Sequence, residues 1–147
     1  MFTHILIPTD GSALSNKAIM AGVKLAKTLG ARVTGVFAAP PPTPIVYRDH
    51  LPVGYTTPRE HAKAIAASGA RYLGAIAKAA KKAGVRCATV QMTSDFPADV
   101  ILAVAGKEKC DLVVMASHGR RGLKGVLLGS ETQDVLSRSK IPVLVCR

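Results

Sequence analysis

Short, almost continuous apolar runs alternate along this chain with longer stretches of helical periodicity. The run 112–116 (Leu-Val-Val-Met-Ala) has no polar face, which is typical of a strand buried on both sides in a parallel sheet. Strands that alternate with helices in this way place helices on both faces of such a sheet. The pattern predicts the α/β class, with strands over 3–9, 32–38, 85–92, 112–116 and 141–146.

The stretches between these runs carry start and stop signals for helices. Four helices are expected: from Ser12 as N-cap to Gly30, over 58–83 up to Gly84, over 98–107 after a cap at Ser94 or Asp95, and over 130–138. The stretch 40–58 is rich in proline and predicts a long irregular excursion. A helix therefore links each strand to the next.

The length of 147 residues predicts a single domain, 1–147. We expect a doubly wound, five-stranded parallel sheet in the order 3-2-1-4-5, with helices on both faces. In such a sheet, a ligand binds beyond the carboxyl ends of the strands, where the winding reverses. Here that point lies between the loops 8–11 and 116–119, which are the most polar, glycine-bearing strand exits of the chain.

The cysteines and the histidines outside residues 115–132 show no spacing that is typical of a metal site. They are scattered at Cys87, Cys110 and Cys146, and at His4, His50 and His61. Scattered cysteines in apolar runs favour free thiols in a reducing compartment. We therefore expect no metal site made by the protein, no export signal and no membrane anchor, and the cytoplasm as location.

The chain is strongly basic, with 20 Lys and Arg against 9 Asp and Glu and a net charge of +11. Such a charge raises the local concentration of anions but does not identify them. Proteins that bind single-stranded nucleic acid interleave basic residues with stacking aromatics, whereas aromatic residues make up 4% here. Many lysines, such as Lys63, Lys78 and Lys82, fall on expected solvated helix faces. Nucleic acid is therefore not expected as a partner.

The most specialised segment is residues 115–132, MASHGRRGLKGVLLGSET. Its glycines let backbone N–H groups approach an anion, and a helix that begins at Ser130 would direct its positive dipole end toward the same place. The hydroxyls of Ser130 and Thr132 could add donors. Arg120, Arg121 and Lys124 are candidate phosphate contacts, although a triphosphate with its metal needs only about two cations. The segment predicts a phosphate-binding loop.

Three segments together resemble the universal stress protein family from end to end. They are the loop spacing Ala116-x2-Gly119-x9-Gly129-Ser130, the opening 5–12 and the close 141–145. The resemblance implies a five-stranded parallel α/β fold. For the branch with a G-2x-G-9x-G-(S/T) loop it implies binding of ATP, AMP or ADP, with Mg²⁺ held through the phosphates. It also implies a homodimer through the C-terminal strand, 141–146.

The resemblance further implies which residues bind the nucleotide. They are Pro8, Thr9, Asp10 and Ala38 on the ribose and adenine side, Met115, Ala116, His118, Gly119 and Arg120 around the ribose and phosphates, and Gly129, Ser130, Glu131 and Thr132 over the phosphate tail. Ala116 replaces the first glycine of the family pattern, which costs little if the residue keeps strand φ and ψ. We expect the Glu131 side chain to turn away from the phosphates while its N–H points inward.

The sequence lacks the usual parts of a site that hydrolyses ATP. It contains no G-x4-G-K-(S/T) segment, and no Ser-His-Asp or Cys-His spacing. His118 has no carboxylate or nucleophile beside it in sequence, so a hydrogen-bonding role is expected. We expect a regulatory or protective stress-response module that depends on an adenine nucleotide and is at most a weak ATPase. The alternatives are a basic module that binds protein or nucleic acid, with a vestigial nucleotide site, and a site for a flavin or another phosphate compound.

Overall fold

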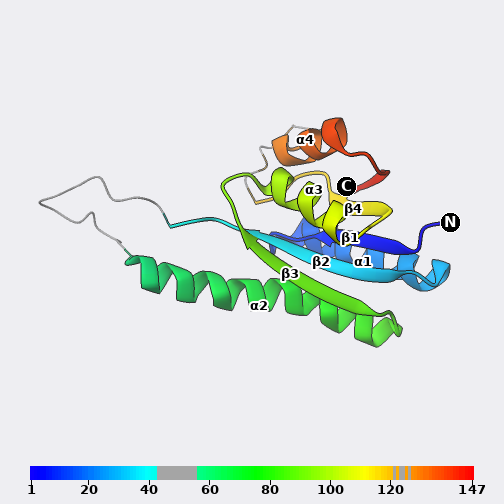
Figure 1. Ribbon diagram of the computed structural model, residues 1–147, viewed down its shortest axis with the longest axis horizontal. Coiled ribbons are helices and arrows are strands. Elements are labelled where there is room, and N and C mark those ends of the chain that lie inside the picture. The colour runs from blue at the N-terminus through cyan, green and yellow to red at the C-terminus, as the bar shows by residue number, and fades with distance from the viewer. Residues whose placement is uncertain (43–55, 121, 123–124, 126) are drawn as a thin grey trace, which may run out of the picture.

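The computed structural model of the chain describes residues 1–42, 56–120, 122, 125 and 127–147. Arg121, Lys124, His50 and most of the proline-rich stretch therefore lie outside the described residues. The elements follow in the order β1 (His4–Pro8), α1 (Ala13–Leu29), β2 (Arg32–Ala39), α2 (Pro58–Ala83), β3 (Cys87–Thr93), α3 (Pro97–Lys107), β4 (Leu112–Ala116), α4 (Ser130–Arg138) and β5 (Val143–Cys146) (Figure 1).

The strands form one parallel sheet in the order β3-β2-β1-β4-β5, which confirms the predicted topology. β1 is central, and its residues 5–7 are fully buried, which explains why this run contains no polar residue. Two strands begin two residues later than predicted, β3 at Cys87 and β5 at Val143, and β1 begins one residue later, at His4. For β5 the preceding Pro142 has no N–H to donate to a ladder. β3 and β5 are the two edges of the sheet.

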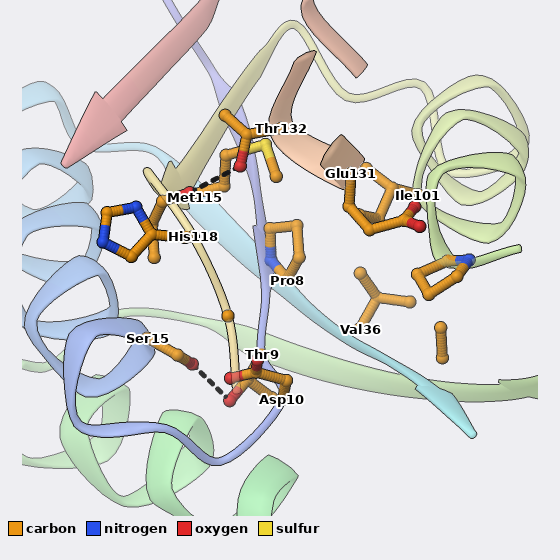
Figure 2. Close-up of a pocket in the computed structure, with 14 residues that line it drawn as sticks. Pro8, Thr9, Asp10, Ser15, Val36, Ile101, Met115, His118, Glu131 and Thr132 are labelled. Atoms are coloured by element: carbon orange, nitrogen blue, oxygen red, sulfur yellow. Dashed lines mark hydrogen bonds between the residues drawn. The ribbon is translucent and has the colours of Figure 1, made fainter. Parts of the chain in front are cut away.

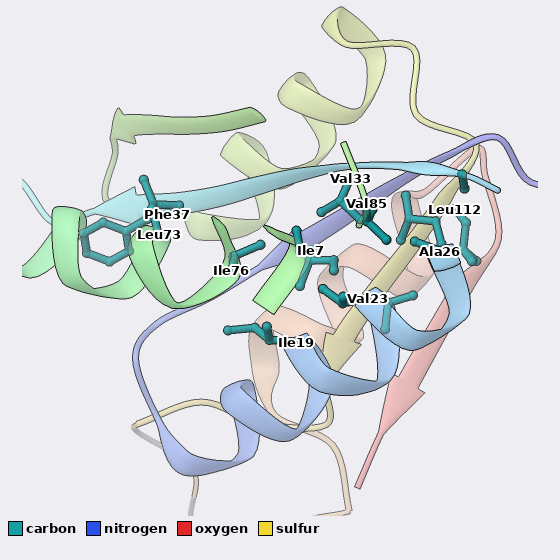
Figure 3. Close-up of a cluster of buried hydrophobic side chains, with 14 of the residues drawn as sticks. Ile7, Ile19, Val23, Ala26, Val33, Phe37, Leu73, Ile76, Val85 and Leu112 are labelled. Carbon is teal, nitrogen blue, oxygen red and sulfur yellow. The ribbon is translucent and has the colours of Figure 1, made fainter. Parts of the chain in front are cut away.

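Helices cover both faces of the sheet, as predicted. α1 and α2 pack on one face, over a core that includes Ile7, Ile19, Val33, Phe37 and Ile76 (Figure 3). α3 and α4 pack on the other face, over Leu6, Val36, Val104, Val113 and Val135. Successive residues of a strand point to opposite faces, so neighbours such as Leu6 and Ile7 enter different cores. No helix in the described ranges is both long enough and apolar enough to cross a membrane.

The ends of α1 and α2 agree with their sequence signals. The Ser12 hydroxyl accepts a hydrogen bond from the N–H of Ser15 at 3.1 Å, and Thr57 forms a capping box at the start of α2. Both helices end at a glycine in the left-handed conformation, Gly30 with φ of 66° and Gly84 with φ of 72°. Because a side chain is strained at such φ, glycine ends both helices and turns the chain into the next segment.

The start of α3 differs from the prediction, since neither Ser94 nor Asp95 caps it. Phe96 occupies the N-cap position without a side-chain bond, and the Ser94 hydroxyl instead accepts from the N–H of Phe96 at 3.0 Å. The first turn is stabilised by another helix, because the Glu131 carboxylate accepts from the N–H of Ala98 at 2.9 Å. The start of α3 is therefore fixed to α4, a long-range contact that local signals could not show.

Candidate functional site

A pocket lies at the carboxyl ends of the central strands, where the sheet order places a ligand site. Figure 2 shows side chains that converge on it from the loops after β1 and β4 and from α3 and α4. It is lined by Pro8, Thr9, Asp10, Ser15, Val36, Ala38, Pro97, Ile101, Met115, Ala116, His118, Gly119, Glu131 and Thr132. All the predicted site residues line this pocket except Arg120, Gly129 and Ser130.

Asp10 holds the two loops of the pocket together. One carboxylate oxygen accepts from the N–H of Ser12 at 2.9 Å, within its own turn, and the other accepts from the N–H of Arg120 at 2.8 Å, in the loop after β4. The Arg120 Nε donates in return to the carbonyl of Asp10 at 2.9 Å. Asp10 is therefore more than a turn residue, because it sets the distance between the loops.

Gly119 is a residue of the loop after β4 whose backbone lies against the Asp10 carboxylate. A Cβ added to Gly119 would collide with the Asp10 carboxylate, so a side chain there would displace the group that links the two loops. The side chain of Arg120 lies outside the pocket lining: its Nη2 donates to the Tyr72 hydroxyl at 2.6 Å, and the guanidinium lies 5.1 Å from the centre of the Tyr72 ring. In this arrangement the guanidinium is engaged with Tyr72, and its contact with a phosphate stays a prediction.

Ala116 replaces the family glycine without backbone strain. It ends β4, and among the described residues other than glycine only Lys109 has a positive φ. The Ala116 carbonyl accepts from the Thr132 hydroxyl at 3.0 Å. That bond fastens α4 to β4, and the contact of the Thr132 hydroxyl with a phosphate stays a prediction.

The start of α4 lies against the same loop. Gly129 is its N-cap residue, and the Gly129 N–H donates to the Ser117 carbonyl at 2.7 Å. A Cβ on Gly129 would come within 3.0 Å of the His118 Cβ, so the close approach of loop and helix requires glycine. No side chain caps α4. The first N–H groups of a helix have no acceptor inside the helix, and they carry its positive dipole end.

Two further polar side chains of the pocket are engaged with the protein. The Glu131 carboxylate turns toward the first turn of α3, where the helix dipole favours an anion, although it still borders the pocket (Figure 2). The expectation that this side chain turns away from bound phosphates stays a prediction. The His118 Nδ1 lies 3.1 Å from the Ser117 hydroxyl, which agrees with a hydrogen-bonding role for this histidine.

A model of the universal stress protein family matches residues 1–147. The chain belongs to the universal stress protein family. Similar curated members are the universal stress protein MJ0531 of Methanocaldococcus jannaschii, 32% identical over 147 residues that cover 100% of this chain and 83% of the relative, and the universal stress protein YxiE of Bacillus subtilis, 32% identical over 154 residues that cover 100% of both.

Solved structures share the fold of this universal stress protein. UspA from Lactobacillus plantarum superposes with a TM-score of 0.77 at 21% identity, over 99% of this chain and 98% of that chain. A protein from Archaeoglobus fulgidus in complex with dAMP gives 0.68 at 15% identity, over 100% and 98%. One from Arabidopsis thaliana with AMP bound gives 0.66 at 16% identity, over 98% and 90%. At these identities the likeness establishes the fold.

Sequence reasoning missed four pocket residues of this universal stress protein: Ser15, Val36, Pro97 and Ile101. Val36 was within reach, because it lies two positions before Ala38 on the same strand and so shares its face. The buried Ser15 pairs with the Thr9 hydroxyl at 2.7 Å, but in sequence it resembles any polar helix residue. Pro97 and Ile101 line the pocket because the start of α3 packs over the strand ends. No local pattern in the sequence shows which helix lies there.

Proposed function

We propose that this universal stress protein binds an adenine nucleotide in the pocket and acts as a ligand-dependent regulatory or protective module, with slow or no hydrolysis. The observation that carries the proposal is the meeting of an apolar pocket with the start of α4, a helix that no side chain caps. An apolar cleft with a few convergent polar groups is the usual form of a small-molecule site. The AMP and dAMP held by structures of the same fold support the choice of ligand.

The residues present fit the parts of such a nucleotide. A purine ring would pack among Val36, Ala38, Ile101 and Met115, whose side chains are apolar. The Asp10 carboxylate could accept from a ribose hydroxyl, because each of its oxygens has a second lone pair beside the amide it already binds. The phosphates would lie at the start of α4, where the helix dipole and unpaired N–H groups favour an anion.

In this proposal the nucleotide couples segments that are far apart in sequence. The loop after β1, the loop after β4 and the start of α4 all border the pocket, and Asp10 already links the two loops. A bound ligand would stabilise one arrangement of them and so change the surface that a partner meets. The ligand would be ATP, AMP or ADP, and Mg²⁺ would bind through the phosphates when ATP is present.

Calorimetric titration with ATP and AMP, each with and without Mg²⁺, tests the proposal directly. The parent protein should bind with a measurable heat, and its unfolding free energy should rise by about 2.7 kcal/mol at a ligand concentration of 100 Kd. An absence of binding at millimolar nucleotide would overturn the proposal and favour a module that acts through its surface. Binding of a flavin in preference to both nucleotides would show that the adenine assignment is wrong.

A matched pair of glycine substitutions localises the binding. Gly119→Ala places a methyl against the Asp10 carboxylate, whereas Gly74→Ala, on the exposed side of α2, adds a methyl that meets nothing within 4 Å. We expect Gly119→Ala to weaken nucleotide binding by about tenfold or more, which corresponds to about 1.4 kcal/mol. Gly74→Ala should bind like the parent. Equal affinity of both variants would place the nucleotide elsewhere.

We also propose that two copies associate through β5. The strand lies at the edge of the sheet, and its Leu144 is 44% exposed. An exposed apolar edge strand favours pairing with a second copy across a two-fold axis. Sedimentation of the parent at high micromolar concentration should show a dimer, and Leu144→Lys should shift it toward monomer. A monomeric parent would contradict this assembly.

A further inference from the structure

The cations of this protein are concentrated on one layer of helices. α1 and α2 together carry nine Lys and Arg residues and one acid, Glu60. α3 and α4 carry two, Lys107 and Arg138, with three acids. Of the 20 Lys and Arg residues nine therefore lie on these two helices, and among the helices the basic excess lies on the face of the sheet that α1 and α2 cover.

The basic side chains point away from the core. On α2, at about 100° per residue, Lys78 and Lys82 fall on the side opposite the buried Leu73 and Ile76, and Lys63 falls on the adjoining flank. All six cations of α2 are exposed: Arg59, Lys63, Arg71, Lys78, Lys81 and Lys82. So are the three of α1, which are Lys17, Lys24 and Lys27. We call these nine residues the basic face.

The basic face is not neutralised by nearby acids. Among the residues that the structure describes, the ion pairs join Arg138 of α4 to Asp99 and Asp134, and none involves the basic face. Both helices pack on the same side of the sheet, so their outer surfaces face the same direction (Figures 1 and 3). With 26 residues α2 is about 39 Å long, slightly more than one turn of a nucleic acid duplex.

The residues between the cations show which polyanion this surface suits. Apart from its cations, Pro58 and Glu60, the exposed residues of α2 are alanine and glycine. No aromatic side chain is exposed on either helix to stack on single-stranded bases, and the buried apolar sides of α1 and α2 cannot turn into a bilayer. Nor does α2 offer the exposed aromatic anchors that dominate protein interfaces. A row of cations that project from a surface of small side chains can contact the regularly spaced phosphates of a duplex backbone.

We propose that the basic face binds the phosphate backbone of double-stranded nucleic acid without sequence selection. The sequence-based expectation that nucleic acid is not a partner rested on the scarcity of aromatic residues, which is a criterion for single strands, and on lysines that fall on solvated helix faces, which are the residues that make up the basic face. Duplex binding needs cations placed along a backbone and no stacking platform. The basic face is separate from the pocket, since none of its nine residues lines it, so this proposal stands independently of nucleotide binding.

Fluorescence anisotropy with a labelled 24-base-pair duplex, at several KCl concentrations, tests the proposal on the intact protein. The test variant is Lys63→Gln/Lys78→Gln/Lys82→Gln, and the matched control is Lys107→Gln/Lys140→Gln/Arg147→Gln, which removes three exposed cations outside the basic face. We expect the slope of log K against log salt to become about 2 to 3 units shallower in the test variant. Its affinity at low salt should fall by about tenfold or more. The control should change the slope by less than about one unit.

Other probes decide between the possible polyanions. Duplex DNA and duplex RNA of equal length should both bind, because the contact is with the backbone. A parent that binds no duplex at 50 mM KCl would overturn the proposal. So would tighter binding to a single strand of the same length, stronger binding to phosphatidylserine vesicles than to duplex, or equal losses in the test and control variants. Circular dichroism of both triple variants should match the parent, because the replaced side chains are exposed.

Discussion

Asp10, at the carboxyl end of the sheet, and Asp111, at its amino end, both accept hydrogen bonds from the backbone of a neighbouring segment. Asp10 binds the N–H groups of Ser12 and Arg120 beside an open pocket. Asp111 accepts from the N–H and hydroxyl of Thr3, each at 2.8 Å, and from the N–H of His4 at 2.9 Å. At both ends a carboxylate accepts backbone hydrogen bonds. At the carboxyl end it borders an open pocket, whereas at the amino end it joins the start of β1 to the segment before β4.

The surroundings of the two carboxylates explain this difference. At the amino end His4 is buried, with its Nε2 2.7 Å from the Thr34 hydroxyl. Burial, followed by the nearby Glu108 carboxylate, raises the pKa of the Cys110 thiol to about 11 and makes it unreactive. At the carboxyl end the strands lead into loops, which leave space between them. Both ends carry polar groups, so polarity does not distinguish them. The candidate site differs from the amino end because it has an open pocket.

Removing each carboxylate should have a different effect at the two ends, mainly on stability at the amino end and mainly on binding at the carboxyl end, and this is the largest expected change. Asp111→Ala loses three hydrogen bonds and should destabilise the fold by about 2 to 3 kcal/mol in urea unfolding, with nucleotide affinity unchanged. Asp10→Ala loses two and should cost about 1 kcal/mol while it weakens nucleotide binding. If both variants lose stability and affinity alike, the two ends are not specialised as described.

A hydroxyl deletion at the amino end gives a smaller effect. Thr34→Val removes the partner of the buried His4 imidazole and should cost about 1 to 2 kcal/mol, because a buried polar group is left without a hydrogen bond. Thr89→Val, on the exposed edge strand β3, is the matched control and should stay within about 0.5 kcal/mol of the parent. Urea midpoints measure both. A loss of the same size in the control would show that the cost comes from valine itself.

Local patterns in the sequence were sufficient to predict the architecture. The apolar run of β1 and the glycines after α1 and α2 gave the right elements, because burial and left-handed turns restrict residue choice at single positions. The alternation of strands and helices indicated a doubly wound parallel sheet, and the order 3-2-1-4-5 was expected for it and confirmed by the structure. The edges of elements were less certain: Phe96 begins α3 without a cap of its own, since a carboxylate from α4 serves its first turn.

The candidate site could be predicted in part. Gly119 and Asp10 were placed in one crevice because the carboxyl ends of parallel strands lie together. The partners of single side chains were not visible in the sequence: Arg120 binds Tyr72, and the Thr132 hydroxyl binds Ala116, and both partners are remote along the chain. The nucleotide contacts expected of these two residues stay predictions. The segregation of charge onto α1 and α2 was also hidden, since a total charge says nothing of which face of a sheet each helix covers.

Acidification should weaken the amino end through His4, the smallest of the three effects. Burial, followed by the Arg32 charge, lowers the pKa of His4 below its ordinary value of about 6.5, although the Glu108 carbonyl and the carboxylates of Asp111 and Glu108 act in the opposite direction. In the described part of the chain its Nδ1 makes no hydrogen bond. The unfolded chain therefore binds more protons than the folded one as the pH falls below about 6.5, so stability falls until the folded pKa is passed.

Thermal unfolding of the parent and of His4→Asn at pH 7.5 and 5.5 measures this loss. Asparagine does not titrate, so the difference in Tm between the two pH values should be smaller in the variant than in the parent. The range stays above the titration of Asp111, because burial, which alone would raise the pKa of this carboxyl, is outweighed by the hydrogen bonds from His4 and Thr3, which lower it. If the variant loses as much stability on acidification as the parent, His4 does not set the pH dependence of the amino end. Asp111 would then be the main polar group that stabilises that end.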